Sequence, residues 1–148
     1  MDWKDLIGLF MIGLAFGTGS AVAQDPQTET EIRKRLEAAE RMPKMFGLIT
    51  KRENIVITQR ATGEPLTIPV QFKKDDDRNV FSVCYPDCGR IQLQLVTDKG
   101  ETVNDRTDPN SVNIIVRTAP AGSHVVKVIL LECPSERCAL GTSIWVKE

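Results

Sequence analysis

The sequence predicts an all-β protein, an antiparallel β-sandwich of about seven to eight strands, with a short N-terminal helix or arm. From Lys51 onward, apolar and β-branched residues recur with a period of two. Turn residues such as Gly, Pro and Asp separate these runs at short intervals. The 148 residues suffice for one domain and are too few for two of full size.

The N-terminus has the pattern of a signal peptide. Lys4 lies in a short polar start, residues 6–16 are apolar, and residues 21–23 read Ala-Val-Ala. An uncleaved membrane anchor is the alternative, but it needs about 20 apolar residues, and Gly-Thr-Gly-Ser follows the apolar run. We therefore expect cleavage after Ala23, a periplasmic or secreted product and no stable membrane anchor. The expected division is signal peptide 1–23, helix and linker 24–50, and sandwich 51–148.

Charge and composition exclude several functions. The chain has 19 basic and 20 acidic residues, one His and eight aromatic residues in total, counting Trp, Tyr and Phe. Nucleic-acid binding needs a basic surplus and stacking platforms, so no nucleic-acid partner is expected. Removal of residues 1–23 takes away Asp2, Lys4 and Asp5 and leaves eighteen groups of each sign, so no polybasic membrane patch is expected. No cofactor is implied.

One helix is expected at residues 25–42. Asp25 is suited to the N-cap and Pro26 to the first helical position. Ile32, Leu36 and Ala39 then recur at helical spacing in a charged stretch, and Pro43 is expected to end the helix. Because the apolar stripe is narrow, a mobile N-terminal arm is the alternative.

The strands follow from alternation and from turn residues. Ile91, Leu93 and Leu95 alternate with glutamines, which predicts a half-buried strand. Pro65 and Pro69 indicate an edge strand, because proline cannot donate a ladder hydrogen bond. Strands are expected at 55–58, 66–72, 80–84, 91–95, 112–117, 124–132 and 142–147, with a charged loop at 73–78 and a turn at 98–100.

Four cysteines in an exported protein predict two disulfides. Cys84 and Cys88 bracket one Pro-containing turn, and Cys133 and Cys138 bracket another. Three connectivities are possible; local pairing is preferred because each turn can bring its own cysteines together. A zinc site is the rival interpretation, but the usual C-x2-C knuckles are absent. Neither pair has the C-x-x-C spacing of a thioredoxin-like redox site.

The strand region resembles a known family. VFSV at 80–83, IQLQLVTD at 91–98 followed by Gly100, and TAPAGSHVVKV at 118–128 are similar to the bacterial pre-peptidase C-terminal domain family. CYPDC at 84–88 and the late cysteine pair resemble its stand-alone exported relatives, which carry a C-x-x-D-C motif. The resemblance covers about residues 53–147. It implies a jelly-roll-like sandwich without catalytic activity, used for binding, targeting or support, and it names no ligand.

The chain departs from this family at three positions. Ser123-His124 follows Gly122 where a Tyr is common in the family, Tyr85 replaces an Asp, and Gln92 replaces the first aspartate of its strand. These departures weaken an inherited ligand site more than they weaken the expected fold.

Loop aspartates are the candidate metal ligands. Asp98, Asp105 and Asp108 are weak calcium candidates, together with the run at 75–77. None of these segments has the D-x-D-x-D-G pattern of a calcium loop, and basic residues flank the carboxylates. Solvated loop charges are therefore the preferred interpretation, and no metal is expected.

A catalytic role for His124 is not expected. There is no G-x-S-x-G elbow, and the adjacent Ser123 points to the opposite face of a strand. His124 is expected to be partly buried in place of an aromatic residue. Without a nucleophile–base pair, a small secreted hydrolase is the least favoured function.

Trp145 is a possible exposed contact for a carbohydrate or protein partner, and the alternative is core packing, which is the more frequent use of a strand Trp. Its neighbours Ile144 and Val146 face opposite to it, so if they fill the core Trp145 is left outside. The sequence therefore predicts a non-catalytic exported binding or accessory protein with an unknown protein or carbohydrate partner. The alternative is an inhibitor or chaperone of a secreted partner that uses sheet edges or the loop at 105–110.

Overall fold

A computed structural model describes residues 25–117 and 119–148 of the chain. The signal peptide predicted at 1–23 lies outside the described residues, as does Thr118. Within the described part, no helix has the length and apolar character that a membrane span requires. The elements are α2 (Pro26–Met45), β1 (Lys51–Arg60), β2 (Leu66–Phe72), β3 (Arg78–Tyr85), β4 (Arg90–Thr97), β5 (Thr102–Asp108), β6 (Ser111–Val116), β7 (Gly122–Glu132) and β8 (Cys138–Val146).

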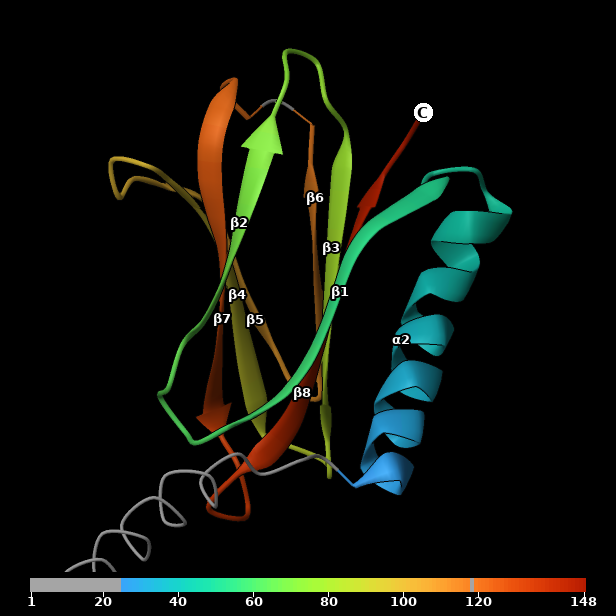
Figure 1. Cartoon of the computed structure of the whole chain (residues 1–148), viewed down its shortest axis with the longest axis vertical. Helices are drawn as coiled ribbons and strands as arrows, with labels where there is room; N and C mark the ends of the chain where they lie inside the picture. Colours follow the sequence, from blue (N-terminus) through green and yellow to red (C-terminus); the bar gives the residue numbers. More distant parts are fainter. Residues whose placement is uncertain (1–24, 118) are drawn as a thin grey trace, which may run out of the picture.

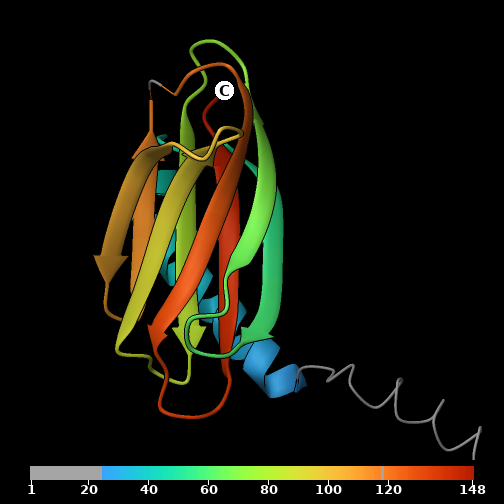
Figure 2. The same cartoon turned by 90° about the vertical axis from the view of Figure 1, so that its left-hand side faces the viewer.

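The strands form two four-stranded antiparallel sheets packed face to face (Figures 1 and 2). Sheet A has the order β1-β8-β3-β6 and sheet B the order β2-β7-β4-β5. Apolar residues from both sheets alternate inward along the strands and meet in one buried cluster. Ile91, Leu93 and Leu95 of β4 are fully buried in it, as their alternation predicts. The predicted antiparallel β-sandwich is confirmed.

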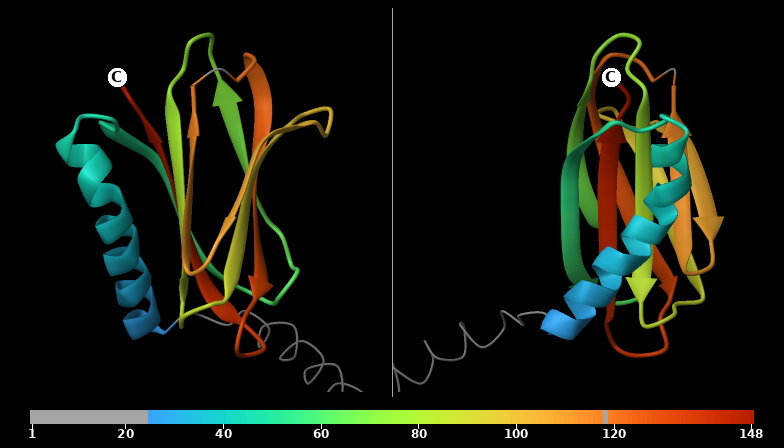
Figure 3. Two further views of the ribbon diagram at one scale, coloured as in Figure 1. Left: turned by 180° about the vertical axis from the view of Figure 1, so that it is seen from behind. Right: turned by 90° about the vertical axis from the view of Figure 1, so that its right-hand side faces the viewer.

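The helix α2 lies across the outer face of sheet A (Figure 3). Its N-cap is Asp25, whose carboxylate accepts a hydrogen bond from the Gln27 N–H, and Pro26 occupies the first turn. Ile32 and Leu36 are fully buried against the sheet. In this structure the segment is therefore a docked helix rather than an arm.

Pro43 does not end the helix, which runs on to Met45. Proline removes only one N–H, and near a C-terminus this costs less than in mid-helix because few hydrogen bonds follow. The N–H of Phe46 donates to the Met42 carbonyl, and the N–H of Leu48 donates to the Pro43 carbonyl. These bonds close the last turn beyond the proline.

One strand was not predicted from the sequence, and several predicted strands are longer in the structure. β5 was expected to be turn and loop because its side chains are polar and mostly exposed on both faces, so it shows no alternation. The extended conformation of β5 is held by backbone hydrogen bonds to β4. β1 and β8 are longer than expected, and they pair along nearly their whole lengths. The edge position predicted for β2 is confirmed, since β2 pairs with β7 alone.

Candidate functional site

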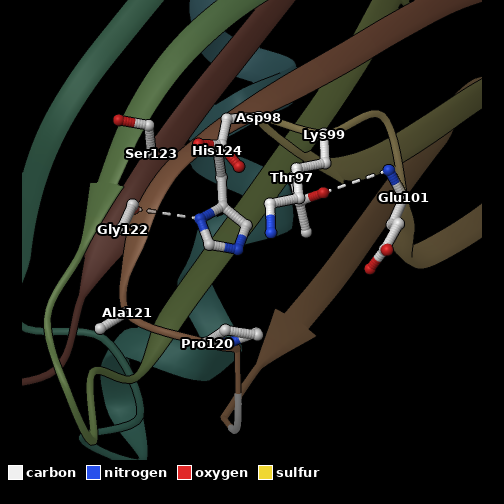
Figure 4. Close-up of a pocket in the computed structure, with 9 residues that line it drawn as sticks. All are labelled: Thr97, Asp98, Lys99, Glu101, Pro120, Ala121, Gly122, Ser123 and His124. Atoms are coloured by element: carbon white, nitrogen blue, oxygen red, sulfur yellow. Dashed lines mark hydrogen bonds between the residues drawn. The ribbon is translucent and has the colours of Figure 1, made fainter.

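A polar hollow of about 340 Å³ opens at one end of sheet B (Figure 4). One wall is the β4–β5 turn, including Thr97 and Lys99, and the other is residues 120–124, which lead into β7. Thr97 and His124 are cross-strand partners in the β4–β7 ladder, so the register places the two turns side by side. The lining residues are Thr97, Asp98, Lys99, Glu101, Pro120, Ala121, Gly122, Ser123 and His124.

Backbone hydrogen bonds fix the β4–β5 wall. The Thr97 N–H donates to the Glu101 carbonyl at 2.8 Å, and the Glu101 N–H donates to the Thr97 hydroxyl at 3.1 Å. Gly100 has φ +84°, a conformation that favours glycine, and no atom lies within 4 Å of a Cβ built there. The N–H of Asp98 donates to the Ser123 carbonyl at 3.2 Å and ties this turn to β7. The wall is therefore preorganised.

His124 lies at the inner side of the hollow and is 3% exposed. Its ring packs edge-on against Phe72, with ring centroids 4.7 Å apart, so it takes the place of a core aromatic residue. Nδ1 is 3.1 Å from the Gly122 carbonyl, which can accept a hydrogen bond from it. Nε2 is buried and has no hydrogen-bond partner within the described residues.

A second hollow of about 200 Å³ adjoins the first on the outer face of β2 and β7. The two hollows share Asp98, Ser123 and His124. The Ser123 hydroxyl accepts a hydrogen bond from Gln71 Nε2 at 2.6 Å, which joins the edge strand β2 to this surface. We call the two hollows together the end groove. It runs from the β4–β5 turn across the start of β7 to β2.

The end groove is lined by acidic, basic and hydroxyl side chains that can bind a polar ligand. Asp98 and Glu101 supply carboxylates and Lys99 supplies an ammonium group, while Ser123 supplies a hydroxyl. In Figure 4 the Lys99 side chain extends across the hollow toward the imidazole, and the Glu101 carboxylate points away from it. Such a surface offers donors and acceptors to a polar ligand, such as a polypeptide backbone.

The described residues assemble no nucleophile–base pair around His124. Ser123 is exposed on the opposite face of β7, and its hydroxyl is bonded to Gln71 rather than to the imidazole. The chain has one histidine, so no other imidazole can serve as a base. The end groove thus has the features of a binding surface.

The three calcium candidates lie in different surroundings. Asp98 lies on the rim of the end groove. Asp105 accepts hydrogen bonds from Gln92 and Gln94, and Asp108 forms an ion pair with Arg106 at 2.7 Å. Among residues 25–117 and 119–148, no three His, Cys, Asp or Glu side chains are grouped so that they could hold a metal ion.

Trp145 is not a surface contact, which corrects that expectation. It does lie outside the inter-sheet core, while Ile144 lies inside it. However, α2 covers it, and it is 5% exposed. Its indole N–H donates to the carboxylate of Glu40, so its partner is the chain's own helix.

The structure contains the local disulfides Cys84–Cys88 and Cys133–Cys138. Because Cys84 is paired with Leu140 in the β3–β8 ladder, both disulfide loops lie at the same end of the sandwich. That end is opposite the end groove (Figures 1 and 2). Two disulfides are typical of a protein from an oxidising compartment.

The sequence predicts a turn at 98–100, one wall of the end groove, and leaves residues 118–123 between two predicted strands, but it does not predict the groove. Asp98-Lys99-Gly100 and residues 119–122 have turn composition, but they are twenty residues apart. Only the pairing of β4 with β7 brings them together. A strand order is set by packing of the whole sandwich, so no local sequence signal contains it.

No protein-family model matches the chain, and no curated protein is similar to it. Among solved structures, the periplasmic g-type lysozyme inhibitor PliG of Aeromonas hydrophila is 4% identical, covering 63% of this chain and 84% of its own, with a TM-score of 0.44. The pre-peptidase C-terminal domain of Bacillus anthracis collagenase is 7% identical, covering 62% and 87%, with a TM-score of 0.45. A carbohydrate-binding module, CBM4, is 6% identical, covering 66% and 76%, with a TM-score of 0.43.

At this level of similarity, none of the three assigns a family or a ligand to this chain. Resemblance to the pre-peptidase C-terminal domain family therefore remains a prediction from the sequence. The class that the fold defines is an antiparallel β-sandwich with one helix on its outer face.

Proposed function

We propose that this chain is an exported, non-catalytic binding module that holds an extended segment of a partner protein in the end groove. The observation that carries the proposal is the elongated groove formed by two adjoining hollows, with walls fixed by backbone hydrogen bonds. A preformed groove lowers the ordering cost of binding. The proposal applies to an accessory subunit, an inhibitor or a chaperone, because each of these roles requires only that a segment of the partner is held.

A protein segment fits this groove better than a sugar does. Saccharide binding commonly uses an exposed aromatic ring as a stacking platform, and the groove is lined by no Trp, Tyr or Phe. An extended polypeptide presents alternating donors and acceptors, which match the carboxylate, ammonium and hydroxyl groups of Asp98, Lys99 and Ser123. The edge strand β2 forms the far wall of the groove.

Export is the second part of the proposal. The apolar run at 6–16, the Ala-Val-Ala at 21–23 and the two disulfides support it. The mature protein then begins at Gln24. N-terminal sequencing of protein taken from the envelope or medium checks this, and a peptide that contains Lys4 would contradict it.

Site-specific photo-crosslinking in the source cells tests the groove. A photoreactive phenylalanine replaces Ala121, which is exposed in the groove, and the control carries it at Thr107, which is exposed on β5. We expect one discrete protein adduct from position 121 and none of that mass from position 107. A Ser123→Tyr substitution, which fills the groove, should abolish the adduct. Equal adducts from both positions, or none from position 121, would contradict the proposal.

A further inference from the structure

Exposed apolar side chains are concentrated at one corner of the molecule. Among the described residues, six large apolar side chains are exposed, and five of these lie at the C-terminal end of α2 or beside it. They are Met42, Met45, Phe46, Leu48 and Ile115, with exposed fractions of 57%, 71%, 68%, 40% and 45%. We call them the apolar tip.

Two residues of the apolar tip come together from distant parts of the chain. Leu48, in the loop after α2, and Ile115, on the outer face of β6, line the same hollow of about 250 Å³. Figure 3 shows the C-terminal end of α2 at a corner of the molecule, on the side of sheet A.

Four cations lie at or beside the apolar tip, and one of them, Lys44, has its Nζ 4.9 Å from the centroid of the Trp145 ring. Arg41 and Lys44 come from α2, Arg117 follows β6, and Lys147 follows β8. Within the described residues, none of these four has a carboxylate within 4 Å. Two carboxylates are near this group: Asp77 lines the same hollow as Arg117 and Lys147, and Glu148 follows Lys147 and pairs with Lys51. The local charge is positive although the chain as a whole is nearly neutral.

We propose that the apolar tip docks on an anionic lipid surface, with Met45 and Phe46 inserted between headgroups and with Arg41, Arg117 and Lys147 paired with lipid phosphates. Exposed apolar side chains flanked by Lys and Arg are suited to the headgroup–acyl boundary. A second copy of the chain fits poorly, because a symmetric contact would bring the two sets of cations together. This surface is separate from the end groove, so the inference does not depend on the proposed function.

Vesicle co-sedimentation tests the proposal. The protein is expressed from the full-length gene and used in the form in which it is purified. The vesicles are equal parts phosphatidylglycerol and phosphatidylcholine, or phosphatidylcholine alone. We expect binding to the anionic vesicles only, weakened by added salt because salt screens the cations. Met45→Ser with Phe46→Ser should lower the partition coefficient about tenfold or more. Val103→Ser, at the sixth exposed apolar residue, is the matched control and should leave it unchanged.

Charge reversal tests the cations separately. Arg117→Glu with Lys147→Glu should lower anionic-vesicle binding about tenfold or more, and Arg90→Glu with Lys127→Glu, on sheet B, should have little effect. All substituted side chains reach the surface, and thermal melting of each variant verifies its fold. The proposal is overturned if the tip substitutions leave binding to anionic vesicles unchanged, or if the wild-type protein binds neutral vesicles equally well. A concentration-dependent dimer in sedimentation equilibrium that Phe46→Ser abolishes would also overturn it, in favour of a second copy.

Discussion

Glu40 shows how one buried residue fixes the helix to the sheet. Its side chain is fully buried between α2 and sheet A. Its carboxylate accepts hydrogen bonds from Arg52 Nη2 and Ser143 Oγ, each at 2.8 Å, and from the Trp145 indole. The Arg52 guanidinium also lies over the Trp145 ring. A buried charge is tolerated when it is paired and hydrogen-bonded, and here two strands, β1 and β8, supply the three partners.

Glu40→Gln should lower the free energy of unfolding by roughly 2–3 kcal/mol. The amide keeps the shape but loses the charge-assisted bonds, and it leaves Arg52 without a carboxylate partner. Urea unfolding measures this loss. Glu37→Gln, one turn earlier on the exposed face of the same helix, is the control and should change stability by less than about 0.5 kcal/mol. Equal effects of the two substitutions would contradict this role for Glu40.

Asp76 makes part of the stability depend on pH. The backbone N–H of Lys73 and the guanidinium of the buried Arg78 hold the pKa of Asp76 below its ordinary value of 3.8. A carboxyl whose pKa is lowered on folding stabilises the fold above its unfolded pKa, and this stabilisation is lost as the pH falls. Asp76→Asn should therefore destabilise by on the order of 1 kcal/mol at neutral pH, with a difference that shrinks below about pH 4.

Chemical unfolding at several pH values measures the difference between wild type and Asp76→Asn. Asp75→Asn is the matched control, because Asp75 is the exposed neighbour, and Asn tolerates its positive φ. A difference between wild type and Asp76→Asn that stays constant from neutral pH to pH 3 would contradict the assignment.

At the scale of elements, α2 sits close to the sheet because β8 has a glycine beneath it. A Cβ on Gly141 would lie 2.3 Å from Ile32 Cγ2 and 3.3 Å from Leu36 Cδ1. The two helix residues fill the space that the missing side chain leaves. Arg35 adds a second tie, since its guanidinium donates to the Cys84 carbonyl and pairs with Asp87 in the disulfide loop.

Gly141→Ala should destabilise by about 1–3 kcal/mol because α2 must move outward. Ile32→Ala alone should cost about 2–4 kcal/mol through the cavity it leaves. The double substitution should cost clearly less than the two single losses combined, because the new methyl group fills part of that cavity. Urea unfolding of the four proteins gives the coupling energy. Additive losses would show that Gly141 and Ile32 do not share this contact.

At the scale of the whole molecule, the two ends of the sandwich differ. One end is tied by both disulfides, and the other carries the end groove. The cations and carboxylates nearly balance over the chain, yet Arg117 and Lys147, which are far from Leu48 in the sequence, line one hollow with it at the apolar tip. A net charge therefore does not describe what a partner meets, because the fold separates charges that are mixed along the sequence.

Calcium should leave the stability of the whole molecule unchanged. Melting temperatures in millimolar calcium and in chelator should agree to within about 2 °C, which is less than the shift from roughly 1 kcal/mol. The reason is that Asp105 and Asp108 are already satisfied by Gln92, Gln94 and Arg106. A concentration-dependent rise of several degrees that disappears in Asp98→Asn or Asp108→Asn would contradict this prediction and indicate a calcium site.

The sequence by itself determined the class of fold, because side-chain alternation follows directly from the two-residue period of a strand. It also determined the edge position of β2 from its prolines, the start of α2 from Asp25 and Pro26, and the inward face of β4. Each of these signals is local, since it depends on neighbouring residues. The polar edge strand β5 has no such signal, and only its pairing with β4 orders it.

The tertiary structure decided which segments meet. The end groove needs the register that sets Thr97 beside His124, and the burial of Trp145 needs a helix that starts over a hundred residues earlier in the chain. The apolar tip likewise joins Leu48 to Ile115. These contacts arise from the packing of whole sheets and the helix, which minimises exposed apolar area over the entire molecule. No window of the sequence contains that information, so the candidate sites became visible only in the folded chain.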